Sequence, residues 1–426
     1  MRQLIFIFFL NIGIVGFAQK SDLKFFIEQS TIHSPLIQQN KASNALLDLN
    51  QQQIKRILTS PEINLESNIL FAPIVSHDNG KNQFQFVSPA ASNYLGFDQA
   101  NTDGGQYQAY LSIKQPVFNN RSLKAYGHKN DILHQLNQNK ITLTIHEIEQ
   151  LIGYQYILCM KSKVLIVNSD SVLNQLDDQI NIMKKLVQHG IYKQTDLMLL
   201  KIEYQNRELE NKTFRDEFHT NLYDLKLLSG VNDPAISDIK LIDIQQKNIF
   251  FENSAFLTSF RLDSLNILAD RSLTELKYKP QLNLFANAGM NAIYLPSVNR
   301  LGFSLGLNFA WNIYDGGQRK LETEKSKINL RTSQFEKDYF LKQKDLNLQK
   351  IQHQLVNLME RMNDTESQLN QYNTILGAYK NELLQGQISI MDFKNLLKDI
   401  TSKKQEKILL QMEKQVLVNA YNYWDY

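Results

Sequence analysis

The residues of this sequence with distinctive chemistry are carboxylates placed at bends in the chain. Asp315 ends a strand-like segment and is followed by Gly316, Gly317 and a charged helical pattern. A carboxylate there can act as an N-cap, because it accepts backbone N–H groups that a helix start leaves unpaired. The two glycines permit the sharp bend. Asp196 and Asp392 each lie six residues after a glycine, and we expect both to be N-caps as well.

No catalytic constellation accompanies these carboxylates. The sequence has no phosphate-binding loop and no nucleophile elbow, and its eight histidines lack a zinc spacing such as H-E-x-x-H. We therefore expect a protein that is not an enzyme and that carries no cofactor or metal. The formal net charge of +3 argues against a nucleic-acid binder, which would show a basic stripe.

The N-terminus has the features of a secretory signal. A short basic start precedes an apolar run, and small residues precede Gln19, so residues 1–18 are predicted to be a cleaved signal peptide. The alternative is an N-terminal membrane anchor, for which the apolar run is short. The single cysteine, Cys159, excludes an internal disulfide.

Four segments alternate apolar with small or polar residues, as strands do. They are 62–71, 106–118, 281–290 and 301–313. Apolar faces on strands of about 9–11 residues suit the lipid-facing wall of a transmembrane β-barrel. The alternative is a half-buried sheet in a soluble domain. Four strands are too few for a pore, so we expect several copies to pool them; three copies would give twelve. The bulkiest face, predicted to contact lipid, consists of Leu301, Phe303, Leu305, Leu307, Phe309 and Trp311.

Two proline-free stretches predict very long helices, over 121–187 and 317–383. Each has 67 residues, or roughly 100 Å at about 1.5 Å per residue. The sequence "HGIYKQTDL" after the first helix aligns with "QGQISIMDF" after the second at an offset of 196 residues. The chain is therefore predicted to be a tandem duplication.

The duplication predicts the domain organisation. The first repeat covers 19–230 and ends in a return helix over 196–230. It includes a loop at 72–105 that we expect to face outside the cell. A linker at 231–256 is expected to pack against the helices as a belt, and the second repeat covers 257–426 with a return helix over 391–424. At the first strand-to-helix junction Asn119 and Asn120 replace the Asp-Gly-Gly of the second, since asparagine also caps helices and tolerates the left-handed conformation.

The chain resembles the TolC-like outer membrane efflux proteins, because its strand-to-helix junctions and its hairpin tips both recur at the same offset in the two halves. The stretch "WNIYDGGQRK" resembles their strand-to-helix signature, and the two Gly-x(5)-Asp segments resemble their periplasmic hairpin tips. The resemblance implies a mainly α protomer with a small β part. Three protomers would share a twelve-stranded β-barrel in the outer membrane and an α-barrel of long helices in the periplasm.

The resemblance also implies partners and roles for particular residues. The protein would be a homotrimeric exit duct that contacts outer-membrane lipid. It would work with a periplasmic adaptor protein and an inner-membrane transporter of the RND or ABC type to export small molecules or polypeptides. Asp392 would lie near the inner constriction, where charged rings bind cations, with Asp196 as its counterpart in the first tip. The residues implied to dock the adaptor are Gly190, Ile191, Gly386 and Gln387.

Two other classes of protein share part of this pattern. A periplasmic coiled-coil adaptor or structural tether would explain the long helices without the four amphipathic strands. A soluble structural repeat protein would not need the bulky face of 301–313. The sequence does not indicate the exported substrate or the cognate pump.

Overall fold

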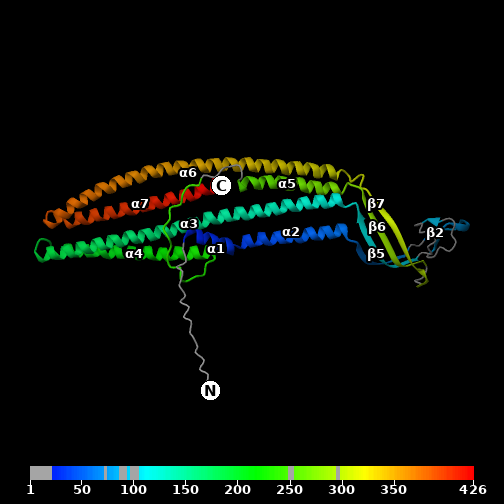
Figure 1. Cartoon of the computed structure of the whole chain (residues 1–426), viewed down its shortest axis with the longest axis horizontal. Helices are drawn as coiled ribbons and strands as arrows, with labels where there is room; N and C mark the ends of the chain where they lie inside the picture. Colours follow the sequence, from blue (N-terminus) through cyan, green and yellow to red (C-terminus); the bar gives the residue numbers. More distant parts are fainter. Residues whose placement is uncertain (1–21, 72–73, 86–93, 96–104, 248–253, 294–297) are drawn as a thin grey trace, which may run out of the picture. The chain divides into compact units, whose positions relative to one another are not determined.

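A computed structural model describes the chain except for residues 1–21, 72–73, 86–93, 96–104, 248–253 and 294–297 (Figure 1). The predicted signal peptide and much of the predicted outer loop therefore lie outside the described residues. The expected fold class is confirmed, since long helices dominate and a small antiparallel sheet accompanies them. None of the described helices is both long and apolar enough to span a membrane.

The order of elements repeats once along the chain. The first half contains α1 (Leu23–His33), α2 (Pro35–Thr59), β1 (Glu62–Phe71), β2 (Ile74–Ser76), β3 (Gln83–Gln85), β4 (Tyr94–Leu95), β5 (Gly105–Val117), α3 (Asn120–Gln188) and α4 (Gln194–Ser229). The second half contains α5 (Ala255–Leu276), β6 (Gln281–Ile293), β7 (Leu301–Ala310), α6 (Gln318–Leu384) and α7 (Ile390–Trp424). The two long helices, α3 and α6, have 69 and 67 residues.

The main sheet has four antiparallel strands in the order β1-β5-β6-β7. Because residues directly opposite each other share a face, the register defines rows across the sheet. One row is Leu65, Leu111, Ala288 and Phe303. The adjacent row, on the other face, is Glu66, Tyr110, Gly289 and Gly302. One face is therefore apolar, and the other is mostly small or polar, with Leu70 and Phe285 as exceptions.

The structure corrects the predicted end of the last strand. β7 ends at Ala310, which pairs with Gln281 at the start of β6. The residue before Gln281 is Pro280, which has no N–H to donate to a further rung of the ladder. Trp311, predicted to be a lipid-facing strand residue, therefore lies beyond the strand, although its side chain is exposed.

A second, three-stranded sheet lies within the segment predicted as an outer loop. Its order is β3-β2-β4, and all three strands are short. The sequence analysis did not predict these strands, because alternation over two or three residues gives no periodic signal.

Two compact units can be distinguished, and each draws on both halves of the chain. Unit 1 contains the described residues of Met1–Asn40, Asn139–Thr258 and Lys337–Tyr426, and unit 2 contains Lys41–Gln138 and Ser259–Glu336. Within unit 1, the predicted belt packs on α3. Ile236 and Ile239 join the buried cluster around Tyr156, and the Tyr156 hydroxyl donates to the Lys240 carbonyl at 2.5 Å.

Candidate functional site

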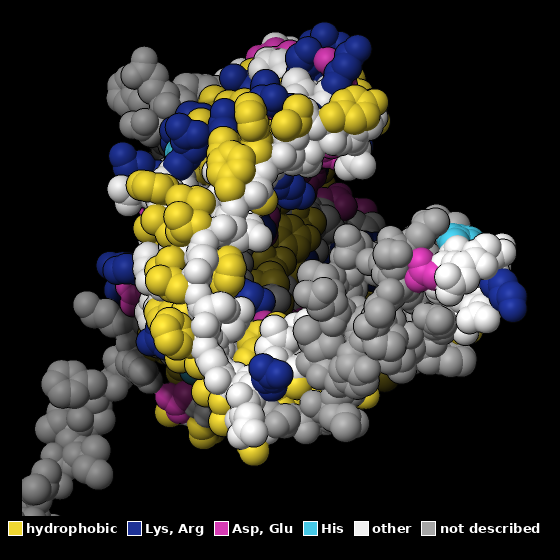
Figure 2. Space-filling model, turned by 90° about the vertical axis from the view of Figure 1, so that its right-hand side faces the viewer, with side chains coloured by type: hydrophobic (Ala, Val, Ile, Leu, Met, Phe, Trp, Pro, Cys, Tyr) yellow, Lys and Arg dark blue, Asp and Glu magenta, His cyan; other side chains and the backbone are white. Residues whose placement is uncertain are grey.

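Most of the apolar face of the main sheet is exposed among the described residues, although Ala292 at one end of β6 is buried. Phe303 is 89% exposed, and Leu65 and Ile69 on β1 are 77% and 78% exposed. Figure 2 shows hydrophobic side chains gathered along one side of the sheet. The six residues predicted to face lipid are all exposed: Leu301, Phe303, Leu305, Leu307, Phe309 and Trp311. Burying such a face stabilises a protein by about 25 cal/mol per Å².

The two outer strands of this sheet are β1 and β7. In the part of the chain that the structure describes, β1 pairs only with β5, and β7 pairs only with β6. Each outer strand thus presents a row of backbone N–H and C=O groups that another strand can pair with.

At the second strand-to-helix junction, α6 begins at Gln318, so Gly317 and not the predicted Asp315 holds the N-cap position. Asp315 lies two residues earlier, but its side chain still binds N–H groups at the helix start. Its carboxylate accepts the Gly317 N–H at 2.9 Å and the Arg319 N–H at 2.8 Å. The Tyr278 hydroxyl donates to the same carboxylate at 2.5 Å. Gly316 and Gly317 have φ of 71° and 84°, a left-handed conformation that glycine adopts without strain. The junction thus turns the chain from strand to helix in seven residues.

These donors also change the acidity of the carboxyl. The hydrogen bond from Tyr278, with the two backbone N–H groups, holds the pKa of Asp315 below its ordinary value. Because the pKa of Asp315 is lower in the folded than in the unfolded protein, the ionised carboxyl stabilises the fold at pH values above the unfolded-state pKa. This stabilisation is lost as the pH falls through the folded-state pKa.

We expect Asp315→Asn to lower the unfolding temperature near neutral pH, because a neutral amide accepts these hydrogen bonds more weakly. The difference from the wild type should begin to shrink below about pH 4, the ordinary pKa of an aspartate in the unfolded chain, and should keep shrinking as pH falls toward the lower pKa of the folded protein. Thermal unfolding between about pH 3 and pH 7 measures this difference. Asp364→Asn, at an exposed position on α6, is the matched control. A difference that is constant with pH would contradict the role of the charge.

The first junction achieves the same bend differently from the prediction. The left-handed residue is Phe118, with φ of 63°, and not either asparagine. The Asn119 side chain does not cap α3; its amide donates to the carbonyls of Leu58 and Pro116, the latter at 3.0 Å. Asn120 is the first residue of α3. Asn119 thus connects the end of β5 to the end of α2 through hydrogen bonds.

Each hairpin tip ends its long helix with a glycine in the left-handed conformation. Gly190 and Gly386 have φ of 74° and 68°. The N–H of the next residue bonds back five residues, from Ile191 to Leu186 and from Gln387 to Glu382, both at 2.9 Å. This is the Schellman motif, which satisfies the last carbonyls of a helix.

The structure corrects the predicted caps of the return helices. α4 and α7 begin after Lys193 and Ser389, respectively, so Asp196 and Asp392 lie in the first turn and are not the capping residues. Ser389 accepts the Met391 N–H at 3.2 Å, and Asp196 accepts the Lys193 N–H at 3.0 Å. An acidic residue in the first turn still favours the helix dipole.

The two tips contact each other within the chain. The Tyr192 hydroxyl of the first tip donates to the Ile388 carbonyl of the second at 2.8 Å. A Cβ on Gly386 would lie 2.8 Å from Cγ2 of Ile191. Below this contact, a shared buried cluster joins both hairpins; it includes Met183, Leu200, Leu383 and Phe393. The two tips are therefore joined by the Tyr192–Ile388 hydrogen bond and by the shared buried cluster next to it.

We expect Tyr192→Phe to loosen the paired tips while leaving the core intact. Losing one hydrogen bond costs about 1 kcal/mol, so amide exchange at Gln387 and Ile388 should be about five-fold faster. Hydrogen exchange measured by mass spectrometry tests this. Tyr204→Phe on α4, whose hydroxyl makes no such bond to the second tip, is the control. Equal protection in both variants would show that the hydrogen bond does not hold the tips.

Several solved structures have a fold similar to that of this chain. The outer membrane protein VceC of Vibrio cholerae is 14% identical, with a TM-score of 0.65 and coverage of 95% of both chains. The outer membrane channel MtrE of Neisseria gonorrhoeae is 10% identical, with a TM-score of 0.64 and coverage of 95% of this chain and 88% of that one. The transmembrane channel CusC is 9% identical, with a TM-score of 0.70 and coverage of 96% and 92%.

This chain has the TolC-like channel fold. The likeness covers 95–96% of this chain. No protein-family model matches the sequence, and no curated protein matches it. At identities of 9–14%, the likeness to the TolC-like fold extends to architecture, which agrees with the resemblance found in the strand-to-helix motif.

Proposed function

We propose that the protein is an exit duct of the outer membrane, formed by three copies of this chain and extending into the periplasm. The observation that carries the proposal is the mostly exposed apolar face of the main sheet. A face of this kind, backed by small and polar residues, fits lipid on one side and a water-filled lumen on the other.

The free strand edges support the oligomer. Four strands cannot enclose a lumen, and open edges do not occur in the hydrocarbon region of a membrane. Pairing β7 of one copy with β1 of the next removes both edges at once. Two copies would give eight strands, and side chains fill the interior of a barrel of that size. Three copies give the twelve strands that the resemblance implies.

Partners and cargo follow from the same proposal. A duct has no energy source of its own, so an inner-membrane transporter would drive export and a periplasmic adaptor would join the two. The docking surface would be the tips around Gly190, Ile191, Gly386 and Gln387. The cargo would be small molecules or polypeptides that pass through the lumen.

Membrane fractionation followed by single-channel recording tests the duct. Protein extracted with detergent from outer membranes should form stable pores in a planar bilayer. Release by a salt wash, with no conductance at any voltage, would overturn the proposal and favour the tether.

We further expect Asp392→Ala to reduce the preference of the pore for cations by about a factor of two or more, since a ring of carboxylates attracts cations. Reversal potentials in a salt gradient measure this preference. Asp399→Ala removes the same charge from α7 two turns away and is the control; Asp196→Ala tests the equivalent position of the first tip. An unchanged reversal potential in Asp392→Ala would exclude this residue from the constriction.

A further inference from the structure

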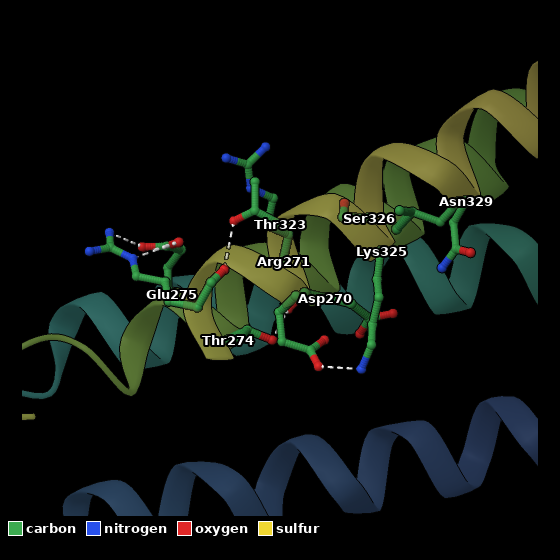
Figure 3. A pocket seen from close by; sticks show the side chains of 11 residues that line it. Asp270, Arg271, Thr274, Glu275, Thr323, Lys325, Ser326 and Asn329 are labelled. Carbon is green, nitrogen blue, oxygen red and sulfur yellow. Dashed lines mark hydrogen bonds and ion pairs between the residues drawn. The ribbon is translucent and has the colours of Figure 1, made fainter. Parts of the chain in front are cut away.

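A polar pocket lies between α5 and α6 in unit 2 (Figure 3). Its volume is about 170 Å³, and both helices contribute polar or charged side chains to its wall. On this measure one water needs only about 10–15 Å³, so the pocket has room for a polyatomic ion. The side chains labelled in Figure 3 include Asp270, Arg271, Thr274, Lys325, Ser326 and Asn329.

The three carboxylates of the pocket are already neutralised by neighbouring cations. Each forms an ion pair with a different basic side chain. The pairs are Glu275 with Arg319 at 2.5 Å, Glu322 with Lys325 at 2.7 Å, and Asp270 with Lys129 at 2.6 Å. The carboxylates are therefore engaged, and no group of three acidic, histidine or cysteine residues in the described chain is arranged to hold a metal ion.

One positive charge remains after this pairing. Arg271 lines the pocket but forms no ion pair with any described residue. A guanidinium has five N–H donors and stays protonated at all physiological pH values. Its fork of donors matches the oxygens of a phosphate or carboxylate.

A buried hydroxyl group faces the same pocket without a partner. Ser326 is 8% exposed, and its Oγ makes no hydrogen bond to another described residue. The hydroxyls of Thr274 and Thr323 differ, because each donates to a carbonyl of its own helix. A buried polar group without a hydrogen bond costs about 1–3 kcal/mol, so the site is more stable with an occupant that pairs with Ser326.

We propose that this pocket binds one oxyanion of the phosphate class. Arg271 supplies the charge that the ion pairs leave over, and Ser326 donates its hydroxyl hydrogen to an oxygen of the anion. The proposal does not depend on the proposed duct.

Two sources could supply the oxyanion, either a soluble phosphate or the headgroup of a phospholipid. The pocket lies on residues 267–329, which flank both strands of the β6–β7 hairpin. If β6 and β7 lie in a membrane, as proposed, the pocket would be close in sequence to membrane-embedded residues, where a phospholipid headgroup could supply the oxyanion. The chemistry recognised is the same in both cases.

The test is calorimetric titration of the purified full-length protein in detergent with inorganic phosphate, at constant ionic strength. Arg271→Gln should weaken phosphate binding by about ten-fold or more, as expected for losing a charged hydrogen-bond partner. Arg261→Gln removes the same charge from an exposed position of α5 outside the pocket and should leave binding within about two-fold. Ser326→Ala should weaken binding without lowering the unfolding temperature of the phosphate-free protein.

A second titration uses micelles containing dihexanoyl phosphatidate, with dihexanoyl phosphatidylcholine as the lipid control. Binding of inorganic phosphate that depends on Arg271 supports a soluble oxyanion. If phosphatidate binds and inorganic phosphate does not, and if binding depends on Arg271, the ligand of this pocket is a lipid headgroup. If neither probe binds, or if Arg261→Gln weakens binding as much as Arg271→Gln, the proposal is overturned.

Discussion

Replacing Leu305 with arginine should prevent the protein from assembling in the outer membrane. Leu305 is the middle residue of β7, 70% exposed on the apolar face, and it pairs with Ala286. An arginine on the lipid face of a barrel costs about 2–4 kcal/mol at the bilayer midplane, and each trimer would carry three. The measurement is the amount of oligomer extracted from outer membranes, relative to total protein.

The neighbouring position provides the control. Ser304 lies on the opposite face, where it pairs with Asn287. Ser304→Arg should therefore assemble normally and shift the ion preference of the pore toward anions. If both arginine variants assemble equally well, the apolar face does not contact lipid, and the proposal of a membrane barrel fails.

Replacing Gly289 with alanine should disrupt the sheet. An added Cβ would lie 2.3 Å from the Ala109 carbonyl oxygen and 2.4 Å from Cα of Tyr110. Both are backbone atoms of β5, so no side chain can rotate away to relieve the clash. Overpacking of this kind costs about 1–3 kcal/mol. Unfolding of the purified protein by heat should show a lower midpoint and a smaller refolded fraction.

Gly302 offers a matched substitution, because it pairs directly with Gly289 on the next strand. A Cβ there would meet nothing within 4 Å. Gly302→Ala should therefore be neutral or slightly stabilising, since alanine loses less backbone entropy than glycine on folding. Equal destabilisation by both changes would indicate that the contact with β5 is not the cause.

Long periodic signals made most of the fold predictable. The long helices and the pairing of strands within each half rest on patterns that continue over ten or more residues. The alternation of apolar and polar residues predicts which face of a strand each side chain lies on. It does not predict whether the backbone pairs with a neighbouring strand. That is why the pattern continued through Trp311 while the ladder stops at Ala310, opposite the residue that follows Pro280.

The junctions show where local reasoning is insufficient. The binding of N–H groups by Asp315 was predictable because its donors lie two and four residues away in the sequence. The role of Asn119 was not, because one of its acceptors is the carbonyl of Leu58, 61 residues earlier. The left-handed conformation of Phe118 also conflicts with the preference of bulky residues, and so no residue-based rule would have placed it there.

The hydrogen bond between the tips joins residues 192 and 388, which are separated by the 196-residue period of the duplication. Each position is thus the counterpart of the other in the two halves. In an ancestor built from identical half-length chains, the bond could have formed in both directions. Ile388 has no side-chain donor, so only the first half can now donate. In the proposed ring of three chains, the Tyr192–Ile388 bond would mark the three contacts between hairpins of one chain and so distinguish them from the three contacts between neighbouring chains.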